Sequence, residues 1–314
     1  LLIPGEGTTV PYDRFRNRII FPIRDGRGRV IAFGGRAMSS DAQAKYLNSP
    51  DTSLFHKGNV LYNIDLARGA VHRQGTVVVV EGYMDVIALA AAGIDEAVAP
   101  MGTALTERQI ELLWRLVETP VLCFDGDAAG QRAARRAATR ALPLLRPGHS
   151  LAFVTLPAGL DPDDLLKQQG RSAMDRLLES PQSLLDLLWQ RERDAQPLKS
   201  PEDKAGLKQR LLEQVETIQH PDIRALYRRE LLDRFSAFAF PKREFKPRQS
   251  GFKPGQRFKA APAPSDTRAL QALSALARDH FTCSVLAGLA RHPREIGRHA
   301  EALASLARAV PGTA

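Results

Sequence analysis

Cysteine is scarce in this sequence, which contains only Cys123 and Cys283. Two cysteines so far apart argue against a disulfide framework and exclude a zinc site built on paired cysteines. Long apolar runs are missing as well. No uninterrupted stretch approaches the roughly 20 residues that a membrane-spanning helix needs, and no cleavable signal precedes the first predicted strand. These absences favour a cytoplasmic protein without a membrane partner.

Two nucleotide-binding signatures are also absent. The sequence contains no G-x-x-x-x-G-K-[ST] motif, so a P-loop ATPase or a fused helicase is not supported. No G-x-G-x-x-G motif follows a predicted strand, which argues against dinucleotide binding. His56 and His72 are isolated, and a surface or loop position is the simpler interpretation for both.

Positive charge is abundant and unevenly placed. The formal net charge is +9, and seven basic residues face the single acid Glu244 between residues 241 and 260. Five prolines between residues 241 and 264 prevent regular helix there. We therefore expect an extended or disordered basic linker. A solvated linker is the simpler interpretation. A second interpretation, compatible with the first, is that the linker also holds polyanions, with Phe245, Phe252 and Phe258 available to stack on bases.

The periodicity predicts an α/β fold with a parallel sheet flanked by helices. Residues 14–36 place two apolar runs around the turn sequence DGRG, which predicts a hairpin. From residue 76 a strand–turn–helix rhythm repeats, as expected for parallel strands joined by helices. The predicted strands are 76–80, 96–99, 120–124 and 151–156, and the predicted helices are 84–92, 106–117 and 128–145.

After Asp161 no strand pattern returns, and apolar residues recur at helical spacing. The helices predicted there are 163–169, 172–179, 183–194, 201–218 and 223–238. This spacing indicates a small helical subdomain. A second helical stretch, rich in Ala and Leu, is predicted at 267–306 after the linker.

Acidic residues follow three of the predicted strands. VVVVEGYMD carries Glu81 and Asp85, VLCFDGD carries Asp125 and Asp127, and GLDPDD carries Asp161, Asp163 and Asp164. Ligands of open parallel sheets collect at the carboxyl edge, so we expect these side chains to converge there. At 4 Å each pair of carboxylates repels by roughly 4 kcal/mol at an effective dielectric of about 20, and divalent cations would neutralise the cluster. All-oxygen ligands favour Mg²⁺ or Mn²⁺ and phosphoryl-transfer chemistry.

Each acidic cluster also has a purely structural explanation. Asp161, which precedes a proline, is typical of a helix N-cap. Asp125 and Asp127 could form a turn, and Glu81 could be a surface acid. The coincidence of three clusters at successive strand ends favours the metal-site interpretation over three separate structural roles.

Longer strings add a family resemblance. EGYMDV, FDGDAAG and DPDD resemble the Toprim fold, which topoisomerases, bacterial primases and some nucleases share. YDRFRNRIIFPIRDGRGRVIAFGGR, KYLNSPDTSLFHKGNVLYNID, VEGYMDVIAL and FDGDAAGQRAARRA resemble the core of bacterial DnaG-type primases over about residues 10–240. The resemblance implies an enzyme that synthesises short RNA primers on single-stranded DNA from ribonucleoside triphosphates, by two-metal nucleotidyl transfer.

The resemblance also implies site residues. The metal-binding carboxylates would be Glu81, Asp125 and Asp127, with additional acidic positions at Asp85, Asp161 and Asp163. The residues that bind nucleotide or template would be Arg36, Lys45, Tyr46, Asn48 and Lys57, and Tyr83 lies inside a matching motif. The implied cofactor is Mg²⁺ or Mn²⁺.

Domains and further partners follow from the same resemblance. The family has an N-terminal zinc-binding domain, which nothing in this sequence could form, and a C-terminal region that docks on the replicative helicase of the bacterial replisome. We therefore expect a fragment in five parts. These are the end of an N-terminal catalytic subdomain (1–75), a Toprim domain (76–171), a helical subdomain (172–240), the linker (241–266) and the beginning of the helicase-interacting domain (267–314).

Two other functions remain open. A nuclease or topoisomerase of the same fold would share the acidic residues, but a type IA topoisomerase needs a nucleophilic tyrosine in a further large domain. A non-catalytic nucleic-acid-binding protein would keep the basic residues without needing all three acidic clusters. The presence of all three favours catalysis.

Overall fold

The computed structural model describes residues 2–3, 11–39, 42, 44–102, 104–240 and 288. Contacts between Cα atoms divide the chain into two units, Leu1–Glu244 and Phe245–Ala314. All described residues except Gly288 belong to the first unit. Apart from Gly288, the linker predicted at 241–266 and the helical region predicted at 267–314 lie outside the described residues.

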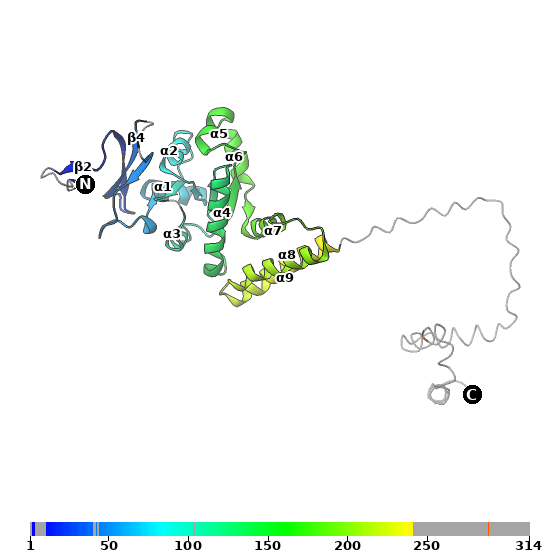
Figure 1. Ribbon diagram of the computed structural model, residues 1–314. Coiled ribbons are helices and arrows are strands. Elements are labelled where there is room, and N and C mark those ends of the chain that lie inside the picture. Colours follow the sequence, from blue (N-terminus) through cyan, green and yellow to red (C-terminus); the bar gives the residue numbers. More distant parts are fainter. Residues whose placement is uncertain are drawn as a thin grey trace, which may run out of the picture. The chain divides into compact units, whose positions relative to one another are not determined.

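A six-stranded sheet forms the centre of the first unit (Figure 1). Its strands run in the order β11-β10-β9-β7-β8-β6. In chain order they are β6 (Leu61–Tyr62), β7 (Val78–Val79), β8 (Ala97–Pro100), β9 (Val121–Phe124), β10 (Ala152–Thr155) and β11 (Gln182–Ser183). The four central strands are parallel, and β6 and β11 are antiparallel edges. The α/β fold predicted from the sequence is confirmed, with strands at all four predicted places.

Strand β11 corrects one expectation, because a strand does return after Asp161. Ser183 pairs with Ala152 and Gln182 with Phe153. This strand is held to the edge of the sheet by backbone hydrogen bonds, and two residues are too few to show an alternating pattern. The boundary predicted between a Toprim domain ending at residue 171 and a helical subdomain beginning at residue 172 stays a prediction.

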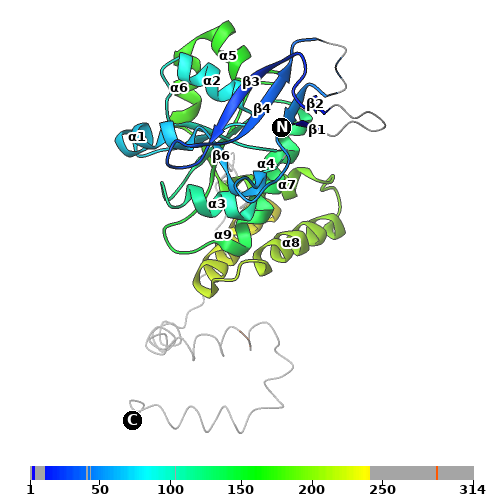
Figure 2. The ribbon, with the colours of Figure 1, turned by 90° about the vertical axis from the view of Figure 1, so that its left-hand side faces the viewer.

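Helices cover both faces of the sheet because strand side chains alternate in direction. Side chains such as Val79 and Leu122 pack against α1 (Ile64–Gln74), α3 (Glu107–Leu113), α4 (Ala128–Ala141) and α7 (Leu184–Asp194). Side chains such as Val80 and Cys123 pack against α2 (Tyr83–Ala91), α5 (Pro162–Gln169) and α6 (Arg171–Glu179). Figure 2 shows the second group together in the upper part of the view and α3, α4 and α7 below it. None of the helices in the described part of the chain is both long and apolar enough to cross a membrane.

A smaller three-stranded antiparallel sheet packs beside the larger one. It contains β3 (Arg18–Arg24), β4 (Val30–Ala37) and β5 (Tyr46–Asn48), and β1 (Leu2–Ile3) pairs with β2 (Tyr12–Asp13) nearby in the sequence. The predicted hairpin turn is present: Asp25 accepts hydrogen bonds from the N–H groups of Arg27 and Arg29, and Gly28 supplies the positive φ of 80°. Ile23 of the small sheet and Tyr83 of α2 share one buried cluster, which joins the two sheets.

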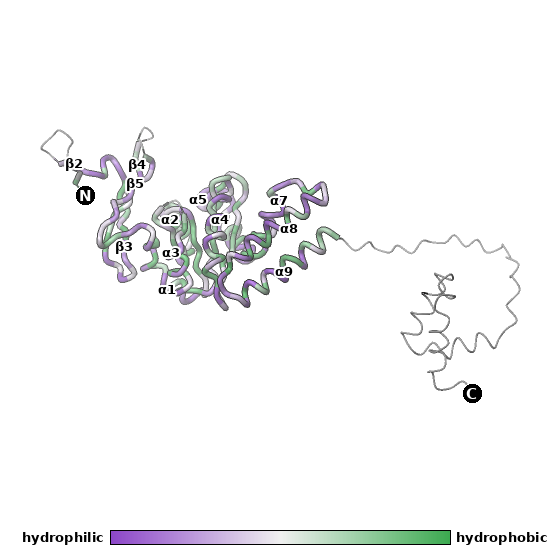
Figure 3. The backbone as a smooth tube through the Cα atoms, turned by 60° about the horizontal axis from the view of Figure 1, so that its bottom comes forward, coloured by the Kyte–Doolittle hydropathy of each residue, from purple (hydrophilic) through white to green (hydrophobic). Residues whose placement is uncertain are grey.

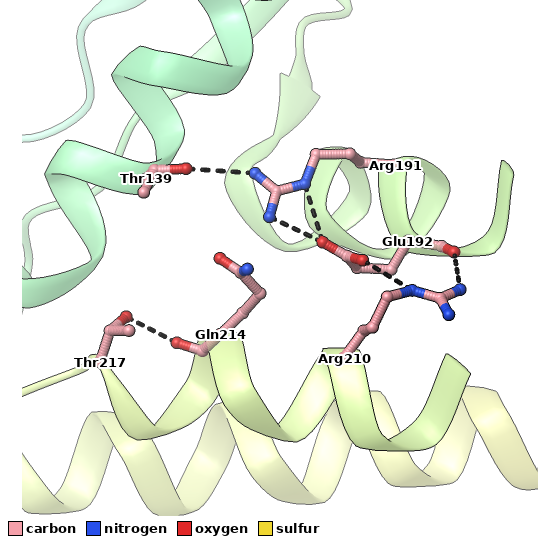
Figure 4. Close-up of polar contacts among 6 residues, drawn as sticks. All are labelled: Thr139, Arg191, Glu192, Arg210, Gln214 and Thr217. Atoms are coloured by element: carbon pink, nitrogen blue, oxygen red, sulfur yellow. Dashed lines mark hydrogen bonds and ion pairs between the residues drawn. The ribbon is translucent and has the colours of Figure 1, made fainter. Parts of the chain in front are cut away.

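Helices α8 (Pro201–Glu216) and α9 (Pro221–Ala239) follow α7 and share a core of their own. Apolar and polar residues alternate along α9 in Figure 3. A buried carboxylate, Glu192 of α7, ties α7 to α8. It accepts hydrogen bonds from Arg191, at 2.7 Å, and from Arg210 of α8, at 3.2 Å (Figure 4). Arg191 also reaches Thr139 of α4, at 3.2 Å, so one network connects α4, α7 and α8.

Candidate active site

Glu81 and Asp85 stand at the turn between β7 and α2. Glu81 comes two residues after β7, and its Oε1 accepts a hydrogen bond from the backbone N–H of Asp125 at 3.3 Å. Asp85 lies in the first turn of α2, where its Oδ2 accepts a hydrogen bond from the Gly82 N–H at 2.9 Å. This contact satisfies one of the N–H groups that a helix start leaves without a partner. The two carboxylates therefore flank one strand-to-helix turn.

Asp125 and Asp127 stand at the next turn, between β9 and α4. Asp127 is the N-cap of α4, and its Oδ1 accepts hydrogen bonds from the N–H groups of Ala129 and Gly130, at 2.8 and 2.7 Å. Two glycines make the turn possible. A Cβ on Gly130 would lie 2.2 Å from the Asp125 carbonyl oxygen, and a Cβ on Gly126 would lie 2.0 Å from the Pro157 carbonyl oxygen. Any side chain at either position would displace the backbone that carries Asp125.

Asp161 caps α5 after β10. Its Oδ1 accepts a hydrogen bond from the Asp164 N–H at 2.7 Å, and Pro162 occupies the first helical position. The cap that the Asp-Pro sequence suggests is therefore present. Asp163 forms an ion pair with Lys167 at 2.5 Å, one helical turn later.

The acidic residues lie close enough together to influence one another's ionisation. The pKa of Asp125 is raised to about 7, chiefly by burial and also by the charges of Glu81, Asp85, Asp161 and Asp127. The pKa of Asp85 is raised to about 6. Burial is the largest cause, the hydrogen bond from the Gly82 N–H opposes it, and the charges of Asp161, Glu81 and Asp163 add to it. Burial raises the pKa of Glu81 as well. The structure thus brings all six predicted acidic residues to the carboxyl edge of the sheet.

The chemistry of these donors fits a hard divalent cation. Every donor is a carboxylate oxygen, and Oδ1 of Asp125 is buried without a hydrogen-bond partner in the described part of the chain. As the described side chains are arranged, however, no three His, Cys, Asp or Glu residues form a ready coordination set. Asp85, Asp127 and Asp161 each use one oxygen for a helix start. Binding of a cation would therefore draw on their remaining oxygens and on Asp125.

The predicted basic and polar residues lie mainly on β4 and β5. The Arg36 guanidinium carbon and the Lys45 Nζ lie 6.0 and 5.7 Å from the centre of the Tyr46 ring. Burial raises the pKa of the Tyr46 phenol, the charge of Arg36 lowers it, and the charges of Asp85 and Asp161 raise it. The group formed by Arg36, Lys45 and Tyr46 is therefore close to the acidic edge.

Lys57 is placed separately from that group. It belongs to the short helix η1 (Lys57–Asn59), its side chain is exposed, and its carbonyl accepts a hydrogen bond from Gln109 of α3 at 3.1 Å. Its backbone N–H donates a hydrogen bond to the Asp51 carboxylate at 3.3 Å, and none of its contacts with described residues is with the acidic side chains at the sheet edge. The structure thus unites Arg36, Lys45 and Tyr46 near the acids but leaves Lys57 on the α3 side.

Tyr83 links the two groups. Its ring lies 4.6 Å from that of Phe21, 5.4 Å from that of Tyr46 and 5.7 Å from that of Tyr62, measured between ring centres. Burial raises the pKa of Tyr83 to about 12. The hydroxyl of Tyr83 and Oδ1 of Asn48 are both buried and without hydrogen-bond partners among the described residues. These aromatic contacts are the side-chain link that the strand and helix pattern alone could not predict.

A parallel sheet with acidic residues at successive strand-to-helix turns defines a protein of the Toprim class. The family model for the Toprim domain matches residues 75–155, and the model for the N-terminal domain of the DNA primase catalytic core matches residues 1–68. A crystal structure of a DNA primase domain from Pseudomonas aeruginosa is 44% identical, with a TM-score of 0.70, and the match covers 74% of this chain and 73% of that one. The chain belongs to the bacterial DnaG-type DNA primase family.

Curated relatives agree with this assignment. The DNA primase of Pasteurella multocida (strain Pm70) is 51% identical over 178 residues, which are 57% of this chain and 30% of that protein. The DNA primase of Escherichia coli (strain K12) is 43% identical over 220 residues, which are 70% of this chain and 38% of that protein. The chain thus spans about a third of the length of these relatives.

Proposed function

We propose that this chain carries the nucleotidyl-transfer machinery of a DNA primase, which synthesises short RNA primers on single-stranded DNA. The observation that carries the proposal is the convergence of carboxylates from three strand-to-helix turns, each raising the pKa of another. Repulsion among the carboxylates destabilises the fold when no cation is bound. A cation held by such a cluster can bind and polarise phosphate groups. The DNA primase names of the relatives support the same reaction.

In the proposed site, Glu81, Asp125 and Asp127 hold Mg²⁺ or Mn²⁺, and Asp85, Asp161 and Asp163 supply further negative charge. A bound divalent cation neutralises charge on the reacting phosphates. The protein itself contributes position. The turns at Gly82 and Gly126 fix the carboxylates by backbone contacts, so that little reorganisation is needed when substrate arrives.

Arg36, Lys45, Tyr46, Asn48 and Lys57 are proposed to bind nucleotide and template. The Arg36 and Lys45 side chains both lie near the Tyr46 ring. A base stacked on that ring would therefore have its phosphates beside positive charge. A solved DnaG catalytic domain bound to single-stranded DNA is 41% identical, with a TM-score of 0.67. In the reaction, the 3′-hydroxyl of the growing strand attacks the α-phosphorus of the next ribonucleoside triphosphate, and pyrophosphate leaves.

The remaining parts of the proposal concern organisation and partners. We propose a catalytic subdomain at 1–75, a Toprim domain at 76–171 and a helical subdomain at 172–240. The region from 267 is proposed to contact the replicative helicase, in the cytoplasm. Limited proteolysis between 241 and 266, and loss of stimulation by the helicase after removal of the residues beyond 240, test these assignments.

The central experiment is template-dependent RNA synthesis on single-stranded DNA, together with Mn²⁺ binding followed by electron paramagnetic resonance. Glu81→Gln and Asp125→Asn should abolish synthesis and weaken Mn²⁺ binding. Glu96→Gln is the matched control, because Glu96 precedes β8 at the opposite edge of the sheet. Mn²⁺ binding at the wild-type level by both site variants would refute the metal assignment, even if no RNA synthesis is detected in the assay.

A further inference from the structure

Helix α4, which starts at the acidic edge, has an unbalanced charge pattern. Its sequence AAGQRAARRAATRA contains four arginines and no acidic residue. Arg132, Arg135 and Arg136 are exposed, and none of the three forms a hydrogen bond or an ion pair with a described residue. Arg140 is different, because it donates a hydrogen bond to the Leu105 carbonyl at 2.6 Å. We call the three unpartnered side chains the α4 arginine face.

Helix α9 also contains four arginines, but three of them have an acidic partner among the described residues. On α9, Arg229 lies 4.0 Å from Asp233, and Arg234 lies 3.2 Å from Glu230. Arg228 reaches Glu216 of α8 at 3.0 Å. On α4, by contrast, Arg132 and Arg136 are like charges one helical turn apart, an arrangement that destabilises a helix by a few tenths of a kcal/mol. The contrast indicates that the α4 arginines meet an anion that is not part of the fold.

The α4 arginine face borders the candidate active site. Helix α4 begins directly after Asp127. Arg135 lines a cavity of about 650 Å³ whose lining also includes Asp125. Arg136 lies on the same helix four residues after Arg132, and its charge is the smallest of the four influences on the pKa of Glu81, which burial raises. The edge thus has positive charge on two sides, from Arg36 on β4 and from α4.

We infer that the α4 arginine face binds the phosphodiester backbone of the primer–template hybrid as it leaves the acidic edge. The inference rests on the proposed function and adds a second phosphate-binding surface to the β4–β5 group. Guanidinium groups suit this role, since their planar donors match phosphate oxygens in a bidentate geometry. Contacts of this type position a nucleic acid without reading its sequence.

The expected size of the effect follows from counterion release. Each phosphate contact contributes about 0.7 to 0.9 to the slope of log affinity against log salt. Loss of three contacts should lower that slope by about 2 to 2.7. Between 50 and 200 mM salt, the wild-type protein should therefore lose about 20- to 40-fold more affinity than a variant without the three arginines.

The test compares the triple variant Arg132→Gln/Arg135→Gln/Arg136→Gln with Arg228→Gln/Arg229→Gln. The control removes arginines that have ion-pair partners on the α8–α9 pair. Fluorescence anisotropy gives the affinity for an RNA–DNA primer–template and for an oligo-dT single strand at several salt concentrations. Thermal unfolding checks that both variants are folded, and the Michaelis constant for ribonucleoside triphosphates is measured on a saturating primer–template.

The triple variant should show the smaller salt slope with the primer–template, and the control should keep the wild-type slope. A larger decrease with the hybrid than with oligo-dT supports the inference, and an equal decrease would overturn it in favour of a surface for single-stranded DNA. An unchanged slope would overturn the inference, as would an effect confined to the Michaelis constant for triphosphate. Glu81→Gln should leave the salt slope intact, so failure of the proposed function is recognised separately.

Discussion

Gln109 offers a sharp test of how the fold positions Lys57. Its side chain is 1% exposed and forms three hydrogen bonds with backbone groups. Oε1 accepts from the Thr106 N–H at 3.0 Å, and Nε2 donates to the Lys57 and Val60 carbonyls at 3.1 and 2.8 Å. One buried amide therefore caps α3 and holds the segment that carries Lys57.

We expect Gln109→Leu to lower the free energy of unfolding by about 3 kcal/mol, at about 1 kcal/mol for each hydrogen bond lost. That loss corresponds to a fall in melting temperature of roughly 6–12 °C. Gln109→Glu should be worse, because it sets an acceptor against two carbonyl oxygens and adds a buried charge. Urea unfolding followed by circular dichroism measures both variants.

Gln168→Leu is the control, since Gln168 is exposed on α5 and its replacement should change stability by less than about 0.5 kcal/mol. A loss below about 1 kcal/mol for Gln109→Leu, or equal losses for the two leucine variants, would refute the reasoning. Comparison with Lys57→Gln adds a functional reading. If Lys57 binds template, both Gln109→Leu and Lys57→Gln should weaken binding of single-stranded DNA at temperatures where each variant is folded.

Three further predictions concern the hydrogen-bond network around Glu192, the helix cap at Asp161 and the turn at Gly126. Glu192→Ala should cost about 3–5 kcal/mol in urea unfolding, because it leaves two half-buried guanidinium groups without their carboxylate; Glu230→Ala, which removes an exposed pair, should cost less than about 1 kcal/mol. Asp161→Ala should cost about 1 kcal/mol as a lost N-cap, whereas Asp161→Asn keeps the cap; weaker Mn²⁺ binding by the asparagine variant would show a role beyond capping, and unchanged binding would show capping alone. Gly126→Ala should cost about 1–3 kcal/mol in thermal unfolding, because its Cβ would overlap the Pro157 carbonyl, and wild-type stability would contradict the turn geometry.

The sequence predicted the elements that have strong periodicity. The strand at 76–80 is a continuous β-branched run and the strand at 120–124 a continuous apolar run, and they appear as β7 and β9. Helix α1 has no comparable signal: its buried positions include two alanines, and Gly69 lies in its middle. Strand β11 is only two residues long, and β10 rather than its own sequence determines its place.

The sequence could indicate which acidic residues belong to the candidate site, but not how their side chains are arranged. Spacing alone indicated that Asp125 and Asp127 would reach the carboxyl edge. It could not show that Asp127 would use one oxygen to cap α4, or that Tyr83 would join the small sheet to this edge. Such facts depend on contacts between distant segments. The arginines of α4 did leave a signal, namely the absence of any acidic residue over residues 128–141, but charge without a visible partner has meaning only once the helix is placed beside Asp125.

The N-cap and metal-ligand interpretations of the acidic residues are therefore compatible, and Asp125 separates them. Asp127 and Asp161 stabilise helix starts whatever else they do, whereas Oδ1 of Asp125 is buried with no hydrogen-bond partner among the described residues. A carboxylate that serves only the fold should not lie unpartnered beside Glu81 and Asp85, because their like charges disfavour its ionisation. We expect Asp125→Asn to raise the free energy of unfolding in EDTA, because it removes repulsion among the carboxylates. Solvent screens part of the side chain, so the gain should be on the order of 1 kcal/mol. The same change should weaken Mn²⁺ binding. Urea unfolding with EDTA and with Mn²⁺ measures both effects, and a variant that is destabilised in EDTA would show that Asp125 serves the fold rather than a bound cation.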